Sequence, residues 1–314
     1  MDTLPQNIIA LGEILWDVFP DRTCFGGAPA NFACAAAELS DGGASVQMLS
    51  GIGQDELGTE ALAQLQSHGV GLGLVQQNGF PTGQVNVELD SSGKANYVFM
   101  EDVAWDNLEW NGVCLEAAQQ ANAVCFGSLG QRSESSAAII QRFVENTPPN
   151  CLRVFDINLR FPHVSDSAIL RSMELANILK LNDEELPYLA KLVQAQGDDE
   201  ITQLDWIRQR FDLDLVAVTC GPEGVVLHTA DHTVRCVTES VQVVDTVGAG
   251  DSFTAAMTLG LLRYSGPNRQ VPSTPEYLES LGRIANEVAA YVCGQPGATP
   301  VFPASLKQKF SFTP

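Results

Sequence analysis

The alternation of short apolar runs with longer segments of helical periodicity constrains the fold of this chain more than any other feature. The apolar runs, which we expect to be strands, are Ile8–Leu11, Val46–Ser50, Ala123–Phe126, Leu152–Asp156, Ile178–Leu181, Leu215–Thr219 and Val241–Val244. The segments with helical spacing of apolar residues, which we expect to be helices, are Ala30–Leu39, Leu57–His68, Ser135–Asn146, Glu184–Leu192, Thr202–Arg210, Ser252–Tyr264 and Glu276–Cys293. Repeated strand-then-helix order predicts an α/β fold in which helices cover both faces of a parallel sheet.

One stretch departs from this order. Residues 84–89 and 95–100 alternate polar and apolar side chains around Asp90-Ser91-Ser92-Gly93, which indicates a hairpin. Such a hairpin is half exposed and lies beside the main sheet, either as a flap over a ligand or as a plain surface hairpin. The chain contains no internal repeat, low-complexity tract or long linker, so residues 1–314 are expected to form a single domain.

The chain is strongly acidic. Its 17 lysines and arginines face 38 aspartates and glutamates, a net charge of −21, which repels phosphate backbones and argues against nucleic acid as a partner. No apolar run approaches the roughly 20 residues that cross a bilayer, and the first residues lack a basic segment and an apolar signal core. We therefore expect a cytoplasmic protein that does not enter a membrane. Its cysteines form no Cys-x-x-Cys pair and are expected to be reduced, and its histidines lack zinc-type partners.

The segment 245–253, Asp-Thr-Val-Gly-Ala-Gly-Asp-Ser-Phe, carries the strongest chemical signal. A strand is expected to end at its first residue, a glycine-rich turn follows, and a helix begins near its end. The amides of Gly248, Ala249 and Gly250, together with the helix N-terminus, form a cradle for an anion. Asp251 stands at the mouth of this cradle, where it is either a helix N-cap or a general base that takes a proton from a substrate hydroxyl.

Two separated motifs resemble the signatures of one family. Residues 245–251 resemble the second signature of the ribokinase-like (PfkB-type) carbohydrate kinases, and residues 26–33, Gly-Gly-Ala-Pro-Ala-Asn-Phe-Ala, resemble the first. Residues 51–58 are similar to the next glycine-rich turn of that family, and the similarity extends from Gly12 to residues 297–300.

The resemblance implies an architecture. It implies a ribokinase-like three-layer α/β/α domain with a mostly parallel central sheet and a small β-sheet lid. The lid would be formed by segments near residues 13–25 and 82–105. Because such a lid often doubles as a dimer surface in this family, the resemblance also implies a homodimer through the lid.

The resemblance further implies roles at matching positions. Asp251 corresponds to the catalytic base, and the amides of Gly248, Ala249 and Gly250 correspond to the anion hole. The implied substrate-binding residues are Asp17, Gly26, Gly27, Asn31, Asp156, Asn158 and Arg160. Without the family pattern, residues 26–31 would be an N-capping turn, Asp17 a surface acid, and Arg160 a partner in a salt bridge.

A second group of matching positions implies nucleotide and metal binding. The implied nucleotide-binding residues are Asn182, Thr219, Gly221, Gly224 and Asn286. Glu185 corresponds to a residue associated with Mg²⁺ through water, an ion that prefers oxygen ligands, and is otherwise part of an acidic first helical turn. Asp245 matches the place where some relatives hold a monovalent cation such as K⁺, and otherwise anchors the turn.

The sequence favours fructose as the acceptor sugar. Relatives that act on ribose or fructose 1-phosphate commonly carry Gly-Gly-Lys-Gly where residues 26–29 here are Gly-Gly-Ala-Pro, so a cation suited to a phosphorylated substrate is absent. Residues 26–31 and 156–160 are more like the fructokinase and 2-keto-3-deoxygluconate kinase branch. Arg160 suits the carboxylate of a sugar acid, which keeps that second substrate open. Residues 161–164, Phe-Pro-His-Val, depart from the Leu-Trp that often follows in this branch.

The sequence therefore predicts an ATP-dependent sugar kinase that transfers the γ-phosphoryl group to a sugar hydroxyl with the help of Mg²⁺. It contains no Gly-x-x-x-x-Gly-Lys-Ser/Thr loop, no strand-associated Gly-x-Gly-x-x-Gly and no Gly-x-Ser-x-Gly elbow. The alternatives are a 2-keto-3-deoxygluconate kinase, another sugar or nucleoside kinase of the family, and a non-catalytic sugar- or nucleotide-binding regulator. Such a regulator would lack the base or the anion turn, and both are present.

Overall fold

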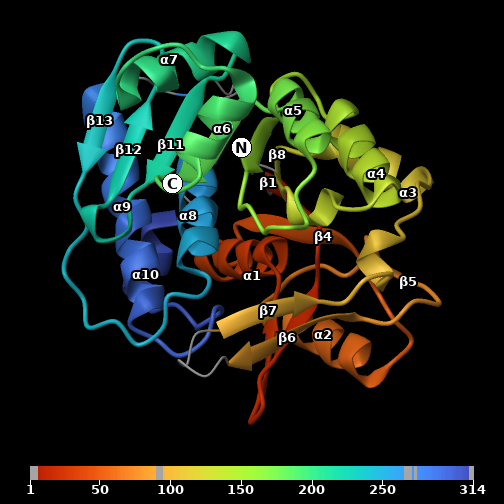
Figure 1. Ribbon diagram of the computed structural model, residues 1–314. Helices are drawn as coiled ribbons and strands as arrows, with labels where there is room; N and C mark the ends of the chain where they lie inside the picture. The colour runs from red at the N-terminus through yellow and green to blue at the C-terminus, as the bar shows by residue number, and fades with distance from the viewer. Residues whose placement is uncertain (1–5, 90–94, 265–270, 272–273, 311–314) are drawn as a thin grey trace, which may run out of the picture.

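A mostly parallel sheet forms the centre of the molecule (Figure 1). The computed structural model describes residues 6–89, 95–264, 271 and 274–310, and within them nine strands pair in the order β13-β12-β11-β10-β9-β8-β1-β4-β5. Their bounds are β1 Gln6–Leu11, β4 Ala44–Ile52, β5 Val75–Gln77, β8 Ala123–Gly127, β9 Leu152–Asp156, β10 Ile178–Asn182, β11 Leu215–Thr219, β12 Val225–His228 and β13 Thr233–Cys236. Pairing is parallel from β5 to β11 and antiparallel from β11 to β13, which confirms the expected fold class.

Helices cover both faces of this sheet and make the three layers. One face packs on α1 Ala28–Ser40, α2 Glu56–Ser67, α8 Ala249–Tyr264, α9 Pro275–Cys293 and α10 Ala304–Lys307. The other packs on α3 Gly112–Gln120, α4 Glu134–Glu145, α5 Asp166–Leu175, α6 Leu186–Val193 and α7 Glu200–Arg210. Alternation along each strand produces both faces, since Ile8 and Ala10 of β1 belong to the first apolar cluster and Ile9 and Leu11 to the second.

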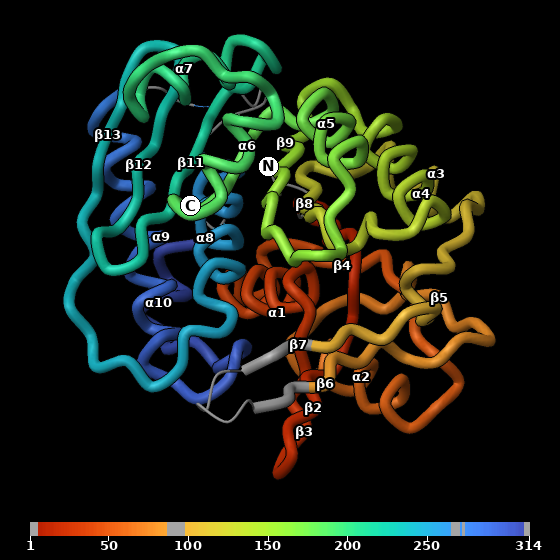
Figure 2. Tube along the Cα trace, viewed as in Figure 1, coloured from red at the N-terminus to blue at the C-terminus, as the bar shows by residue number. Residues whose placement is uncertain are grey.

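The small second sheet is also present, with the order β3-β2-β6-β7 (Figure 2). Its strands are β2 Leu15–Val18, β3 Thr23–Gly26, β6 Gly83–Leu89 and β7 Ala95–Phe99. The β6–β7 pair confirms the predicted hairpin, whose turn at residues 90–93 lies outside the described residues. β2 pairs antiparallel with β3 and parallel with β6, so the sheet joins the segment after β1 to the hairpin.

A buried cation links the small sheet to the body of the protein. Arg132 donates to Asp106 at 2.6 Å, and its guanidinium lies 4.1 Å from the centre of the Trp105 ring. Trp105 in turn packs with Leu15 of β2 and Val85 of β6. Trp105 and Asp106 belong to the single-turn 3₁₀ helix Ala104–Asp106, and Arg132 directly follows a second one, Leu129–Gln131. Two further 3₁₀ helices lie at Gly221–Glu223 and Gln308–Phe310.

The predicted strand Val241–Val244 is wrong, because the structure has irregular backbone there. Val243 and Val244 are each 60% exposed, so this apolar run does not enter the core. The reason lies at the edge of the sheet: the antiparallel β12 and β13 follow β11, and α9 packs on them. A strand needs a neighbour for its backbone groups, and here Val244 donates instead to the carbonyl of Cys293 at the end of α9.

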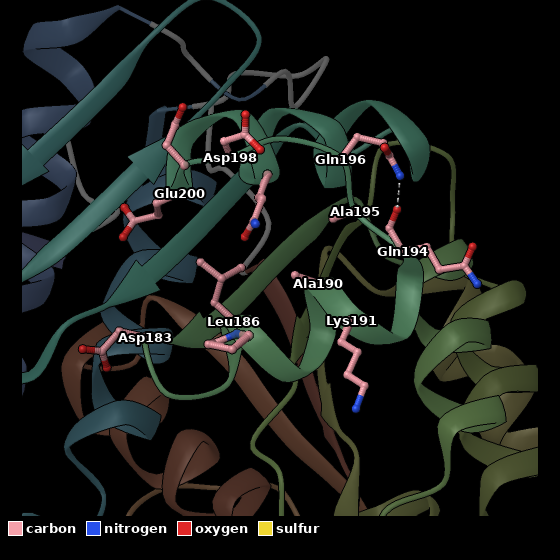
Figure 3. Close-up of a pocket in the computed structure, with 12 residues that line it drawn as sticks. Asp183, Leu186, Ala190, Lys191, Gln194, Ala195, Gln196, Asp198 and Glu200 are labelled. Carbon is pink, nitrogen blue, oxygen red and sulfur yellow. Dashed lines mark hydrogen bonds between the residues drawn. The ribbon is translucent and has the colours of Figure 1, made fainter.

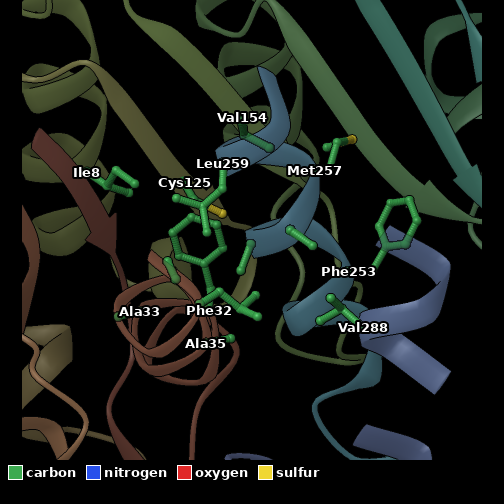
Figure 4. Packing of buried hydrophobic residues seen from close by; sticks show 14 of the residues in the cluster. Ile8, Phe32, Ala33, Ala35, Cys125, Val154, Phe253, Met257, Leu259 and Val288 are labelled. Atoms are coloured by element: carbon green, nitrogen blue, oxygen red, sulfur yellow. The ribbon is translucent and has the colours of Figure 1, made fainter. Parts of the chain in front are cut away.

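Packing of α1 against α8 fixes the position of both helices (Figure 4). Phe32 of α1 and Phe253 of α8 are each 1% exposed and share an apolar cluster with Cys125 of β8 and Val154 of β9. A fully buried side chain of this size contributes about 1.5–3 kcal/mol. The first turns of α1 and α8 thereby meet at the carboxyl edge of the sheet, where β8 and β9 end.

No helix among the described residues is long and apolar enough to span a bilayer.

Candidate active site

Asp251 and Asn31 meet where α1 and α8 begin. Asn31 Nδ2 donates to Asp251 Oδ2 at 2.8 Å, although the two residues are 220 positions apart. Asn31 is 4% exposed, and its Oδ1 has no hydrogen-bond partner within the described residues. The contact brings together the predicted base and a predicted substrate-binding residue, and leaves a buried acceptor oxygen beside them.

The glycine turn before Asp251 adopts a backbone that other residues adopt with difficulty. Gly248 has a φ of +77°, and a Cβ there would lie 2.6 Å from the carbonyl oxygen of Ala298. The helix begins at Ala249, and the amide of Ser252 donates to the carbonyl of Gly248 at 2.8 Å. The amide of Ala249 already donates to the carbonyl of Thr246 at 3.3 Å. Because the first amides of a helix lack intrahelical acceptors, the turn suits the approach of an anionic oxygen chiefly through Gly248 and Gly250.

Burial raises the pKa of Asp251 from its ordinary value of 3.8 to about 6. The negative charge of Asp156 acts in the same direction, and the hydrogen bond from Asn31 and the charges of Lys180 and Arg160 oppose it. A carboxylate with this pKa is a stronger base than an exposed aspartate and is still ionised at neutral pH.

A second carboxyl group faces the same pocket. Glu13, which follows β1, is 3% exposed, and burial raises its pKa from 4.5 to about 7. Its Oε1 accepts a hydrogen bond from the amide of Ala28 at 3.2 Å, and its Oε2 is buried with no partner within the described residues. Glu13, Asp251, Asn158 and the apolar side chain of Phe32 line one pocket at the carboxyl edge of the sheet.

The predicted substrate-binding residues on the small sheet lie next to this pocket. Asp17 on β2 points at Gly26, where a Cβ would be 3.1 Å from Asp17 Oδ2. Burial raises the pKa of Asp17, and the charge of Arg160 opposes this shift. Gly27, with a φ of +106°, precedes α1, and a Cβ there would meet the Glu13 carbonyl oxygen at 2.5 Å.

The predicted residues that follow β9 differ in what they contact. Asp156 lines the pocket, but its two carboxylate oxygens already bind Lys180 Nζ at 3.0 Å and Thr254 Oγ1 at 2.9 Å. Asn158 has a φ of +41°. Arg160 is exposed and donates to the carbonyl of Leu159, and it forms no salt bridge within the described residues.

The predicted nucleotide-binding residues lie at the ends of the neighbouring strands β10 and β11. Asn182 and Glu185 bind one another, since Asn182 Oδ1 accepts from the Glu185 amide at 2.8 Å and Glu185 Oε2 accepts from the Asn182 amide at 2.9 Å. Glu185 Oε1 accepts from the amide of Leu159 at 2.7 Å, and burial raises the pKa of Glu185. Both oxygens of this carboxylate therefore accept a hydrogen bond from a backbone amide.

The other predicted nucleotide residues lie beyond β11. Thr219 Oγ1 donates to the Leu181 carbonyl at 3.3 Å, and Gly221 and Gly224 have φ values of +51° and +96° in the turn that follows. Asn286 on α9 is 5% exposed, and its side-chain Nδ2 donates to the carbonyl of Cys236 at 2.9 Å, so the oxygen of its amide group is the part left for a nucleotide.

Asp245 anchors its own turn in the structure. Its Oδ1 accepts a hydrogen bond from the amide of Val247 at 3.0 Å, and its amide donates to the carbonyl of Cys293 at 3.2 Å. Clusters of three or more histidine, cysteine, aspartate or glutamate side chains able to hold a metal ion are absent from the part of the chain that the structure describes.

A hollow between α6 and α7 borders the ends of β10 and β11 and shares no residue with the pocket that Asp251 lines (Figure 3). The carboxylates of Asp183, Asp198, Asp199 and Glu200 line it. None of the residues that we predict to bind nucleotide is among the described residues that line this hollow. Its negative charge disfavours phosphate groups, and we give it no part in the reaction.

Comparison with known proteins decides the family. The sequence pattern of the pfkB family of carbohydrate kinases matches residues 19–305. The chain belongs to this family. Fructokinase-1 of Oryza sativa subsp. japonica is 29% identical over 322 residues, which cover 96% of this chain and 96% of that protein.

Solved structures of carbohydrate kinases share the fold along nearly the whole chain. Fructokinase with bound ATP from Xylella fastidiosa matches with a TM-score of 0.85 and 26% identity, covering 98% of both chains. A sugar kinase from Pyrococcus horikoshii in complex with ATP matches with a TM-score of 0.75 and 26% identity, covering 93% of this chain and 94% of that one.

Sequence reasoning missed two buried ionisable residues near Asp251 in the candidate active site, Glu13 and Lys180. Each had a signal in the sequence. Glu13 stands two positions after β1, at the edge of a parallel sheet where ligands bind. Lys180 is a lysine inside the apolar strand β10, and a charge at such a position is fully buried only when it is paired.

Proposed function

We propose that the protein is an ATP-dependent fructokinase. The observation that carries the proposal is Asp251 at the first turn of α8, held by Asn31 in a pocket at the carboxyl edge of the sheet. Fructokinases from rice and from Xylella fastidiosa, the latter with bound ATP, are similar to this chain over almost its whole length. These similarities support both the nucleotide and the sugar.

In the proposed reaction Asp251 takes the proton of the attacking sugar hydroxyl while the γ-phosphoryl group moves in line from ATP. The amides of Gly248, Ala249 and Gly250 hold the negative charge that develops. Position matters more than basicity here, because the proton leaves late in a loose transition state. The hydrogen bond from Asn31 keeps the carboxylate of Asp251 directed into the pocket.

Buried acceptors fit a neutral polyol. Glu13 Oε2 and Asn31 Oδ1 have no partners within the described residues, and a buried acceptor without a donor is unfavourable by about 1–3 kcal/mol. Sugar hydroxyls supply such donors. Asp17 and Gly26 of the small sheet, and Gly27 at the N-terminus of α1, would hold the sugar.

On the nucleotide side, we assign phosphate and adenine contacts to Asn182, Thr219, Gly221, Gly224 and Asn286. Mg²⁺, when bound, supplies positive charge to the phosphate oxygens. Glu185 would hold that ion through water, since the carboxylate oxygens already bind backbone amides. Asp245 is the proposed contact of a K⁺ ion: the hydrogen bond from the amide of Val247 uses only Oδ1 of its carboxylate, which leaves Oδ2 as an oxygen ligand.

Arg160 gives a reason to test 2-keto-3-deoxygluconate as a second substrate. Its guanidinium forms no salt bridge among the described residues, and its charge acts on Glu13, Asp17 and Asp251. A free guanidinium near the pocket can bind a carboxylate through paired hydrogen bonds. Asp156 and Asn158 would shape the same side of the substrate.

The proposal includes the organisation of the chain. Residues 1–314 would act as a single kinase domain in which the small sheet is the lid, and the surface of this sheet would join two copies in a homodimer. Sedimentation of the purified protein, with and without substitutions on β6 and β7, would test the dimer.

The experiment that tests the function is ADP release from MgATP with fructose, 2-keto-3-deoxygluconate, ribose, adenosine and fructose 1-phosphate, each assayed with wild type and with Asp251→Asn. We expect fructose to give the highest kcat/KM and Asp251→Asn to lose turnover while still binding ATP. Highest activity on another compound would change the substrate. Absence of turnover on all of them, with ligand-induced thermal shifts retained, would indicate a non-catalytic binding protein.

A further inference from the structure

A buried ion pair lies behind the first turn of α8. Lys180 Nζ on β10 binds Asp156 Oδ1 at the end of β9 at 3.0 Å, and their side chains are only 7% and 9% exposed. Thr254 of α8 donates to the second oxygen, Asp156 Oδ2, at 2.9 Å. The network therefore connects two central strands to the helix that carries Asp251.

The ammonium group of Lys180 reaches the glycine turn itself. A Cβ on Gly250 would lie 3.2 Å from Lys180 Nζ, so the ammonium lies against the backbone immediately before Asp251. The same Thr254 hydroxyl lies 2.9 Å from the Gly250 carbonyl oxygen, which shares its single proton with Asp156 Oδ2. A fixed positive charge thus lies beside the amides that are proposed to hold the negative charge that develops during phosphoryl transfer.

Fold stability alone is a weak explanation for this pair. Removing two charges from water is unfavourable, and a well-packed apolar pair in such a place is often as stable or more so. Burial opposes the charge of Lys180, but the carboxylates of Asp156, Glu185 and Asp251 outweigh it and raise the pKa of Lys180. The lysine is therefore charged at neutral pH.

We propose that Lys180 is a positioning residue for phosphoryl transfer: held by Asp156 against Gly250, it keeps a positive charge beside Asp251 so that this base stays a carboxylate. The proposal rests on the proposed function in assigning the base role to Asp251. Lys180 itself touches neither substrate; it acts through the turn and through Asp251.

The other groups that face Asp251 come from every element packed around it. They are Glu13 after β1, Asn31 on α1, Cys125 on β8, Asp156 on β9 and Arg160 in the segment that follows β9. Glu185, at the start of α6, faces Lys180. A substitution at Lys180 leaves the identity of each of these groups unchanged, so a comparison that removes only the lysine tests the effect of its charge.

The test removes the lysine in an Asp156→Asn background, because Lys180→Met alone would leave a buried carboxylate without its cation. In Asp156→Asn, a negative charge is lost and Lys180 remains, so the pKa of Asp251 should fall. The acid limb of the pH profile, the range in which kcat/KM falls as Asp251 becomes protonated, should then move to lower pH by about one unit. In the double variant Asp156→Asn/Lys180→Met, the limb should return upward by about one unit or more.

Two controls separate charge from fold. Lys180→Arg, made with the native Asp156, keeps the positive charge and should leave the acid limb at its wild-type position. Lys307→Met removes a different paired lysine, bound to Glu38 at the far end of α1 at 2.6 Å, and should leave the limb unmoved. Identical acid limbs in Asp156→Asn and in the double variant would overturn the proposal and leave the pair a purely structural role.

A readout without turnover keeps the test independent of the proposed function. The free energy of unfolding of each variant, measured with and without Asp251→Asn across pH 5–8, reports the pKa of Asp251 by linkage. If the pKa of Asp251 moves in opposite directions in Asp156→Asn and in the double variant, the proposal is supported even if no sugar is phosphorylated. Equal displacements contradict it even in an active kinase. If the wild type phosphorylates no sugar, the proposed function is rejected instead.

Discussion

Replacing Asp251 by Asn should remove activity and make the protein more stable at the same time. Burial raises the pKa of Asp251 from 3.8 to about 6, a difference of about 2 units, and each unit corresponds to about 1.4 kcal/mol. The folded protein therefore binds a proton more tightly than the unfolded chain at this site. Because the pocket admits solvent, part of the effect is screened, and we expect a gain of about 1–3 kcal/mol at pH 8.

The sign of the pH dependence follows from the same shift. Between the unfolded and folded pKa values the folded state holds more protons, so wild-type stability falls as pH rises through about 4 to 6. Above this window the ionised Asp251 destabilises the fold by its full amount. Asp251→Asn carries no such charge, so its advantage should be largest at pH 8, about half as large at pH 5, and lost below about pH 4.

Urea unfolding followed by circular dichroism at pH 8 and pH 5 measures this difference. The matched control is Asp199→Asn at the start of α7, where hydrogen bonds from Thr202 hold the pKa of Asp199 below its ordinary value. That change should lower stability at pH 8. The reasoning is refuted if Asp251→Asn is less stable than wild type at pH 8, or if its advantage is the same at both pH values.

Three further results are expected. In wild type, kcat/KM should fall as pH drops below about 6, because Asp251 becomes protonated; a pH–rate profile measures this. Asn31→Ala removes a hydrogen bond that lowers the pKa of Asp251, so the acid limb should move to higher pH, and an unmoved limb in the same profile would contradict this. Gly248→Ala places a Cβ 2.6 Å from a carbonyl oxygen at a φ of +77°; thermal unfolding should show a loss of about 1–3 kcal/mol, and an unchanged Tm would contradict it.

The layered fold could be predicted from the sequence because its strands are buried on both faces and read as continuous apolar runs. The hairpin of β6 and β7 is predicted from the opposite pattern, since a strand that buries only one face alternates apolar and polar residues. The run Val241–Val244 looked like a buried strand, but its valines are exposed, since β12 and β13 already complete that edge of the sheet. Periodicity reports which residues could pack, and neighbours in space decide whether they do.

The site was predictable where a motif is contiguous and obscure where it is assembled from distant segments. The turn at residues 248–251 was found directly because backbone amides, a helix start and an acid follow one another. The pairing of Asp156 with Lys180 was not, because 24 residues separate them and only the parallel register of β9 and β10 brings them together. For the same reason the sequence predicts that Asn31 binds the sugar but does not predict its hydrogen bond to Asp251, which lies 220 positions away.

The division of the molecule into two sheets has a consequence for how such kinases diversify. Asp17 and Gly26 belong to the four-stranded sheet, whereas Asp251 belongs to a helix on the nine-stranded one. Under the proposed function, mutations in β2, β3, β6 and β7 can change which sugar is accepted without altering the base or its electrostatic surroundings. A lineage can therefore acquire a new substrate through a small set of surface strands while purifying selection preserves the reaction chemistry in the core.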